Sequence, residues 1–84
     1  MFEIVFSKDA RQQLRRMRTN DAKRIVQKID LLAVDPFASS PNASALKGGG
    51  FRLRVGDWRI LYEIDGRANL LQVAAVLPRG RAYR

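Results

Sequence analysis

Cysteine and histidine are both absent from this sequence, and each absence excludes a class of chemistry. Without cysteine the chain forms no disulfide and offers no thiolate ligand to a metal. Without histidine it lacks the most common general base and the most common metal ligand. We therefore expect no metal site and no cofactor, and an acid–base step would have to use another type of residue.

Long apolar runs are also missing. No stretch approaches the roughly 18 apolar residues that suggest a membrane-spanning helix, so we expect no contact with a membrane. The N-terminus lacks the basic and apolar regions of a signal peptide, which favours a cytoplasmic protein. With 84 residues, of which 46% are apolar, the chain suits one small folded unit, and we expect residues 1–84 to form a single domain.

Positive charge is abundant. The chain has 16 Lys and Arg against 8 Asp and Glu, a formal net charge of +8. Such an excess on a small domain favours nucleic acid, an acidic protein, or both as partners. All lysines lie in residues 1–50, whereas every basic residue of 51–84 is an arginine. Arginine grips phosphate through two parallel hydrogen bonds, but it cannot lose its proton and act as a base.

Residues 51–62 carry the most informative pattern. Apolar and polar residues alternate in two runs around the Gly-Asp pair at 56–57, which is typical of half-buried strands joined by a two-residue turn. The turn fixes the register. One face then holds Phe51, Leu53, Val55, Trp58, Ile60 and Tyr62 for the core. The opposite face, here called the Arg face, carries Arg52, Arg54 and Arg59.

This register sets Arg54 directly opposite Arg59. Like charges that face each other on a sheet are destabilising, so the arrangement has a cost that an anionic ligand would offset. The alternative is a solvated strand face on which the arginines splay apart. We favour the anion-binding interpretation, because a facing pair of arginines with a third arginine nearby is uncommon.

The first half of the chain predicts a strand and two helices. Residues 2–6 are expected to form a strand, and Ser7 is a suitable cap for a helix that continues to about residue 17. A second helix is expected to start among the capping residues 19–21 and to end before Pro36. Its apolar stripe comprises Ala22, Ile25, Val26, Ile29, Leu32 and Ala33. Because the link is short, the helices should form an antiparallel hairpin.

The polar side of the first helix is strongly basic. It carries Lys8, Arg11, Arg15, Arg16 and Arg18. We interpret this set as a solvated helix face and favour that interpretation over direct contact with RNA.

The second half of the chain predicts a loop followed by strands. Residues 36–50 are expected to be a loop, and the three glycines at 48–50 are a poor match to a phosphate-binding loop because no Lys-Ser/Thr follows. The Asp-Gly pair at 65–66 predicts a second hairpin, and residues 70–77 a last strand. The core-facing residues of that strand are predicted to be Leu71, Val73, Ala75 and Leu77.

The expected fold class is therefore α+β. An N-terminal strand leads into the helical hairpin and then into a three-strand antiparallel meander. The helices pack on one face of the sheet, and the Arg face stays open on the other.

Three stretches resemble the RelE/ParE toxin superfamily of bacterial toxin–antitoxin systems. They are Leu-Lys-Gly at residues 46–48, the paired runs at 51–62, and residues 76–83, and the resemblance extends over essentially the whole chain. It implies a compact toxin that is bound by a longer, acidic antitoxin. RelE-type members enter the ribosomal A site and cut mRNA, whereas ParE-type members inhibit DNA gyrase.

The resemblance also implies a set of site residues. RelE-type toxins carry basic residues on the first meander strand, an Arg that opens the next strand, and an Arg and a Tyr near the C-terminus. The matching catalytic candidates are Arg52, Arg54, Arg59, Arg79 and Tyr83. Additional contacts with RNA are expected from Lys47, Arg81 and Arg84. The match departs at residues 77–78, where Leu-Pro replaces the Gly-His of many relatives.

Cleavage of RNA by its own 2′-hydroxyl requires a base, neutralisation of the crowded phosphate and an acid for the leaving oxygen. The arginines can neutralise the phosphate, but none can be the base. Tyr83 is the candidate base in the tail, since neighbouring guanidinium groups would lower its pKa from about 10. Alternatively Tyr83 only stacks on a nucleobase, and both roles stay open.

Three functions fit these observations. The first is a ribosome-dependent mRNA endonuclease with an acidic antitoxin, the ribosome and mRNA as partners, whose complex with the antitoxin is a candidate for binding operator DNA. The second is a ParE-type inhibitor of gyrase, and the third is a degenerate toxin retained as an antitoxin-binding corepressor. The arginine and tyrosine set favours the first, because inhibiting gyrase needs no phosphate-cutting centre.

Overall fold

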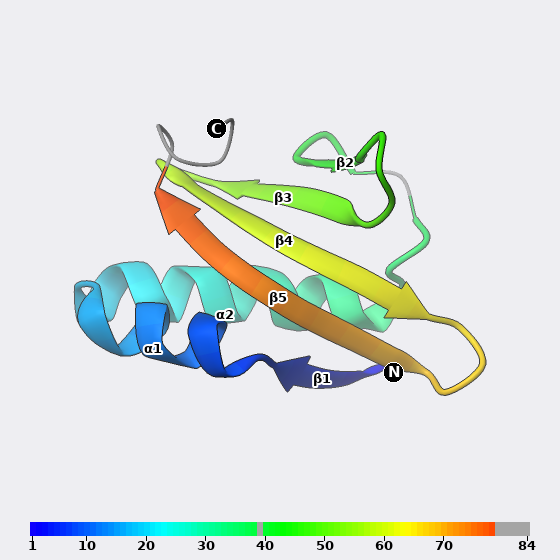
Figure 1. Ribbon diagram of the computed structural model, residues 1–84, viewed down its shortest axis with the longest axis horizontal. Coiled ribbons are helices and arrows are strands. Elements are labelled where there is room, and N and C mark those ends of the chain that lie inside the picture. Colours follow the sequence, from blue (N-terminus) through cyan, green and yellow to red (C-terminus); the bar gives the residue numbers. More distant parts are fainter. Residues whose placement is uncertain (39, 79–84) are drawn as a thin grey trace.

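A computed structural model describes residues 1–38 and 40–78. Within these residues, two helices and a five-stranded mixed sheet make up the fold (Figure 1). The elements are β1 (Glu3–Phe6), α1 (Lys8–Arg16), α2 (Thr19–Val34), β2 (Ala43–Ala45), β3 (Phe51–Val55), β4 (Trp58–Asp65) and β5 (Leu70–Pro78). The strand order is β1-β5-β4-β3-β2, with β1 parallel to β5 and the other pairs antiparallel. The predicted α+β class is confirmed.

Helix α1 begins where the sequence predicts, at the cap residue Ser7. The hydroxyl of Ser7 accepts a hydrogen bond from the Ala10 backbone N–H at 3.0 Å, which satisfies one of the free donors of the first turn. The same hydroxyl donates to the Ala74 carbonyl at 2.6 Å, and the Ser7 N–H donates to the Val73 carbonyl at 2.9 Å. The cap thus attaches the start of α1 to β5. From there α1 continues in the direction of β1 (Figure 1).

Helix α2 runs antiparallel to α1, as the short link between them predicts (Figure 1). The prediction of a polar cap was wrong, because Arg18 occupies the cap position and makes no capping hydrogen bond through its side chain. The helix ends at Val34, ahead of Pro36, as expected. None of the described helices is long and apolar enough to cross a membrane.

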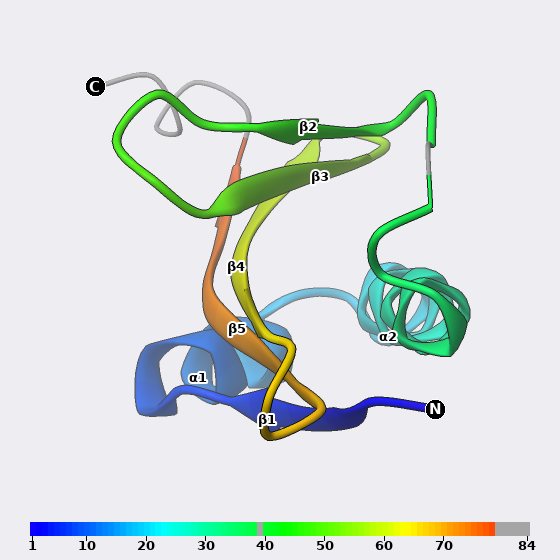
Figure 2. The ribbon, with the colours of Figure 1, turned by 90° about the vertical axis from the view of Figure 1, so that its right-hand side faces the viewer.

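One hydrophobic core joins both helices to the sheet. Ala10 of α1 and Ile25, Ile29, Leu32 and Ala33 of α2 are buried in it. The strands contribute Leu53, Val55, Ile60, Tyr62, Leu71, Val73 and Val76. Figure 2 shows α2 nearly end-on, beside a sheet that curves strongly from β2 and β3 to β1. Each fully buried aliphatic side chain contributes about 1.5–3 kcal/mol to folding.

Residues 36–50 are not wholly a loop, which corrects one prediction. Residues Ala43–Ala45 form β2, which pairs with β3 at the edge of the sheet. The Arg54 backbone N–H donates to the Asn42 carbonyl at 2.8 Å and extends this pairing. The sequence gives little sign of this strand, because Ala-Ser-Ala has weak β propensity and the strand is very short.

A β-bulge in β5 changes which of its residues face the core. The pairing of β4 with β5 skips Ala74, so two residues of β5 lie where the regular ladder has one. Beyond this point the alternation is reversed, because each strand residue points to the face opposite its neighbour's. Val76 is fully buried in the core, whereas Ala75 and Leu77, predicted to be core residues, point to the Arg face and are only half-buried.

Candidate functional site

The β3–β4 hairpin positions the Arg face with the predicted register. Arg54 pairs with Arg59, and Arg52 pairs with Leu61 on the same face. The turn has Gly56 at a φ of +57°, the left-handed conformation that the first central position of a type II′ turn requires. On the core face, the Phe51 and Tyr62 rings stack with their centroids 5.4 Å apart, which stabilises this register.

The three arginines differ in exposure, which corrects the expectation of a uniformly open face. Arg54 is exposed and Arg52 is half-buried, but Arg59 is only 3% exposed. The Nη1 of Arg59 donates to the Trp58 carbonyl at 3.4 Å, and neither Arg59 nor Arg52 is without partners. Alternation assigns a residue to a face of the sheet, but it does not determine what else covers that face.

Apolar groups surround these arginines because of the bulge. Leu77 pairs with Arg59, and Ala75 pairs with Leu61, so three half-buried apolar residues share the face with the arginines. Such surroundings lower the local dielectric constant, which strengthens the attraction between a guanidinium and an incoming anion. The Arg face is thus suited to hold a phosphate more firmly than a solvated strand would.

Other predicted site residues are not brought to this cluster or cannot be placed. Lys47 is exposed in the turn between β2 and β3, where the Leu46 N–H donates to the Gly50 carbonyl at 3.0 Å. That turn precedes Phe51, at the end of β3 remote from Arg54. The predicted residues Arg79, Arg81, Tyr83 and Arg84 lie outside the described residues.

Tyr62 is not a substitute for a base in the tail. Its side chain is buried on the core face, and desolvation by this burial raises the pKa of the phenol above its usual value of 10.0. The phenol therefore stays protonated at neutral pH. Trp58 also packs against the core, as its position in the alternation predicts, rather than offering an open stacking platform on the Arg face.

Sequence reasoning missed a basic groove next to the Arg face. A hollow of about 490 Å³ lies between α2 and the hairpin. The residues that line this basic groove are Arg24, Lys28, Asn42, Arg54, Val55 and Gly56. The spacing of Arg24 and Lys28, one helical turn apart and off the apolar stripe, was the available signal. Nothing in the sequence groups them with Arg54, because their place in one hollow depends on how α2 crosses the sheet.

Comparisons with solved structures identify this fold in bacterial and archaeal toxins. The toxin of the RelE–RelB complex from Pyrococcus horikoshii OT3 superposes with a TM-score of 0.83 at 21% identity, covering 95% of this chain and 97% of that chain. The RelBE2 complex of Mycobacterium tuberculosis gives a TM-score of 0.78 at 23% identity over 93% of this chain and 98% of the other. For the YoeB/ParE toxin of Agrobacterium tumefaciens the TM-score is 0.77 at 20% identity, with 92% and 98% covered.

At these identities the likeness establishes the fold alone. No curated protein gave a significant match. A family model does match, and it spans residues 4–83, which include both helices, the whole sheet except Glu3, and the Arg face. Its description is "ParE toxin of type II toxin-antitoxin system, parDE". The chain therefore belongs to this family of type II toxins, within the RelE/ParE superfamily.

Proposed function

We propose that this toxin is a ribosome-dependent mRNA endonuclease that inhibits translation in the cytoplasm. The observation that carries the proposal is the pairing of Arg54 with Arg59, with Arg52 on the same face and apolar side chains around them. Guanidinium groups held on adjacent strands are preorganised for a phosphate whose charge increases in the transition state. Arginine at these positions presents a bidentate fork, which a lysine would not.

The proposed roles follow from exposure. Arg54, which is exposed, contacts the scissile phosphate. Arg59, which is buried and pairs with Arg54, supplies a second positive charge at a fixed position. Arg52 contacts the neighbouring part of the strand. Arg79 completes the phosphate contacts, and further contacts with RNA come from Lys47, Arg81 and Arg84. No metal or cofactor takes part in the proposed reaction.

Tyr83 is the proposed general base. Changing Tyr83 to Phe keeps the ring for stacking and removes only the hydroxyl. We expect single-turnover cleavage on programmed ribosomes to fall by about 10²–10⁴-fold while ribosome binding is retained. The companion change Arg79→Lys keeps the charge but removes the fork, and should reduce the rate less. A near-wild-type rate for Tyr83→Phe would leave the tyrosine as a stacking residue only.

The partner proposed to control this activity is an acidic antitoxin. Its binding is supported by the net charge of +8, and similar toxins were solved as complexes with RelB antitoxins. An acidic segment on the Arg face would occupy the phosphate position and block the RNA. The complex is a further candidate for binding operator DNA, through charges that the antitoxin leaves uncovered.

Inhibition of DNA gyrase is the second candidate, because the matching family model is described as ParE. One experiment separates the candidates. The purified toxin is added to a translation reaction with a defined mRNA, whose 5′ ends are mapped with and without ribosomes, and to a gyrase supercoiling reaction. New 5′ ends that require ribosomes support the proposal. Loss of supercoiling without new ends supports the gyrase inhibitor, and antitoxin binding with neither effect supports a corepressor.

A further inference from the structure

The basic groove gathers positive charge from two separate elements. Arg24 and Lys28 come from one flank of α2, and Arg54 comes from β3. Among the described residues that line the hollow, none has an acidic side chain. Like charges one helical turn apart are mutually destabilising, and a third cation adds to this cost. A concave surface with charge of one sign also concentrates the potential, which attracts an ion of the opposite sign.

Gly56 brings the guanidinium of Arg24 close to the hairpin turn. A Cβ at this position would lie only 2.5 Å from Nη2 of Arg24, so any larger residue would push that side chain away. The left-handed φ of Gly56 suits the turn, and its lack of a Cβ leaves room for the approach of Arg24. The Arg24 guanidinium thus lies close to the backbone of the turn, while the residue as a whole is exposed.

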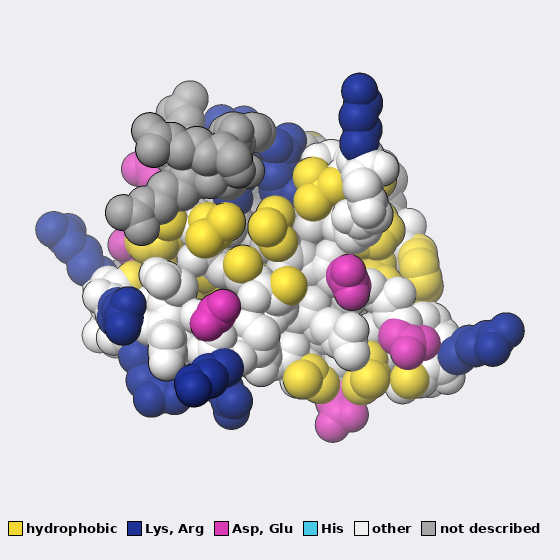
Figure 3. Space-filling model, viewed as in Figure 1, with side chains coloured by type: hydrophobic (Ala, Val, Ile, Leu, Met, Phe, Trp, Pro, Cys, Tyr) yellow, Lys and Arg dark blue, Asp and Glu magenta, His cyan; other side chains and the backbone are white. Residues whose placement is uncertain are grey.

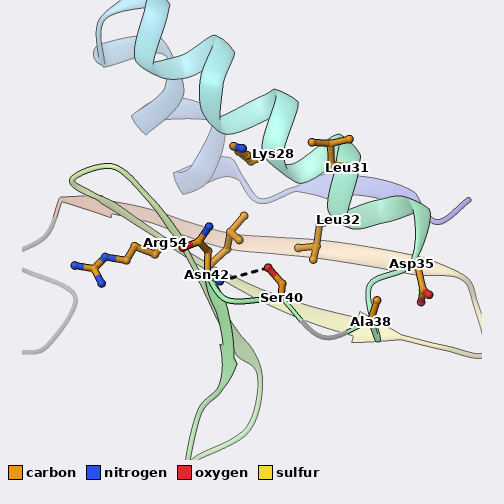
Figure 4. A pocket seen from close by; sticks show the side chains of 9 residues that line it. Lys28, Leu31, Leu32, Asp35, Ala38, Ser40, Asn42 and Arg54 are labelled. Carbon is orange, nitrogen blue, oxygen red and sulfur yellow. Dashed lines mark hydrogen bonds between the residues drawn. The ribbon is translucent and has the colours of Figure 1, made fainter.

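The groove is continuous with the Arg face through Arg54. Figure 4 shows the Arg54 side chain extending past Asn42 and away from Asp35. The hollow drawn there, about 270 Å³, continues along α2 toward Asp35 and is lined by leucines such as Leu32. The positive charge is thus concentrated at the hairpin end of this surface, where it meets the Arg face.

We propose that the basic groove binds a phosphodiester group of a single-stranded nucleic acid, so that a strand held on the Arg face continues past the hairpin turn to α2. Arg24 supplies the bidentate fork, Lys28 a point charge and Asn42 an amide donor. The inference rests on the proposed function only in taking mRNA as the natural strand. A nucleic acid fits better than an acidic peptide, because the one apolar side chain in the lining, Val55, is already buried and leaves no anchor pocket.

The test compares two variants that remove equal charge. Arg24→Gln with Lys28→Gln alters the groove, and Arg11→Gln with Arg15→Gln alters a pair with the same spacing on α1. Binding of a short single-stranded RNA, and of DNA of the same sequence, is measured by fluorescence anisotropy over a range of salt concentrations. The groove variant should bind RNA about tenfold or more weakly, with a salt slope smaller by about 1.4, or 0.7 for each lost contact. The control should change about twofold or less.

Several outcomes would overturn the inference. Equal losses for the two variants would show a diffuse effect of net charge, and no loss for either would leave the groove without a ligand. A Glu-rich peptide whose binding depends on Arg24 and Lys28, when RNA binding does not, would reassign the groove to a protein.

Two outcomes support the inference and define the ligand. Equal losses of RNA and DNA binding by the groove variant assign the groove to any phosphodiester strand, whereas a loss of RNA binding alone assigns it to RNA. Thermal melts establish that each variant is folded.

The same variants separate this inference from the proposed function. If the wild-type toxin cuts no mRNA but the groove variant still loses oligonucleotide binding selectively, the groove site stands and the proposed function fails. If the wild-type toxin cuts mRNA and the groove variant binds and cuts equally well, the groove site alone is refuted.

Discussion

Two basic regions of this toxin contain the same types of side chain in different settings. The α1 basic face comprises Lys8, Arg11, Arg15 and Arg16 of α1 together with Arg18, which precedes α2. All five residues are exposed, and Figure 3 shows lysine and arginine side chains gathered over α1. On the Arg face, Arg54 is exposed while Arg59 is buried among half-buried apolar groups. The number of charges is therefore a poor guide to where an anion binds tightly.

The difference lies in solvation and rigidity. Two unit charges 4 Å apart interact by about 1 kcal/mol in water and by about 4 kcal/mol at the effective dielectric constant near a protein surface. Salt screens exposed charges much more than buried ones. Side chains on paired strands are also held closer to a fixed geometry than those extending from a helix. We therefore expect the α1 basic face to attract partners at a distance and the Arg face to bind and act on them.

The largest effect should come from removing one charge of the Arg face, and it is compared with the removal of one charge from the α1 basic face. We expect Arg54→Ala to reduce single-turnover mRNA cleavage by about 10²–10³-fold, equivalent to roughly 2.7–4 kcal/mol, as for loss of one preorganised donor. The matched change Arg15→Ala should alter the rate less than about threefold, because a solvated charge contributes little to the transition state. The measurement uses programmed ribosomes at saturating toxin. Equal losses for the two variants would erase the distinction between the regions.

The next largest effect should be on the free energy of unfolding, and it follows from the bulge at Ala74. Val76→Ala should lower the free energy of unfolding by about 2 kcal/mol, from the lost methyl groups and the cavity that remains in the core. Leu77→Ala removes more atoms, yet it should cost less than about 1 kcal/mol because Leu77 lies half-buried on the Arg face. Urea denaturation of both variants checks this order. A larger cost at Leu77 would mean that the alternation runs unbroken through β5.

Within the Arg face, the two facing arginines should differ in their contribution to stability, because one is buried and the other exposed. We expect Arg59→Ala to lower the free energy of unfolding by about 1–2 kcal/mol, because the packing and hydrogen bonding of a buried guanidinium are lost. Arg54→Ala should raise it by about 0.2–1 kcal/mol, since it removes the like charge from across the strand pair. Thermal and urea melts of the two single variants give the comparison. Stabilisation by both changes would indicate that Arg59 contributes only repulsion.

The smallest expected effect concerns the rate of association with an acidic antitoxin. Replacing Arg11, Arg15 and Arg16 with Gln should lower the association rate constant by about two- to tenfold at low salt and leave dissociation unchanged. Arg54→Gln should instead speed dissociation. Stopped-flow mixing at several salt concentrations measures both constants. If the triple variant changed only the dissociation rate, the α1 basic face would belong to the bound interface.

The hairpin was the part of the fold that the sequence determined best. Its register follows from two local facts, the Gly-Asp turn at 56–57 and strict alternation on both sides, so Arg54 could be paired with Arg59 without knowledge of the rest of the chain. The helices were predicted equally well in their extent, because Ser7 and Pro36 mark boundaries through local backbone chemistry.

Features that depend on contacts between distant segments were not predictable. The bulge at Ala74 leaves no mark in the nearly continuous apolar run of β5, so two residues were assigned to the wrong face. The burial of Arg59 depends on what covers the sheet, and the approach of Arg24 to Gly56 depends on how α2 crosses it. The predicted chemistry of Arg79 and Tyr83 lies beyond the described residues and stays a prediction.

The parallel pairing of β1 with β5 has a consequence for synthesis of the toxin. Glu3 lies opposite Leu70 and Phe6 opposite Val73, so β1 has no partner strand until residues 70–73 have left the ribosome. At about 5–20 residues per second this interval lasts several seconds, and such long-range pairings also form slowly. The arginines of the hairpin emerge before β5, the strand that braces β4 from the other side. A nascent chain therefore carries the arginines of the hairpin before it has β5, the strand that completes the sheet around them.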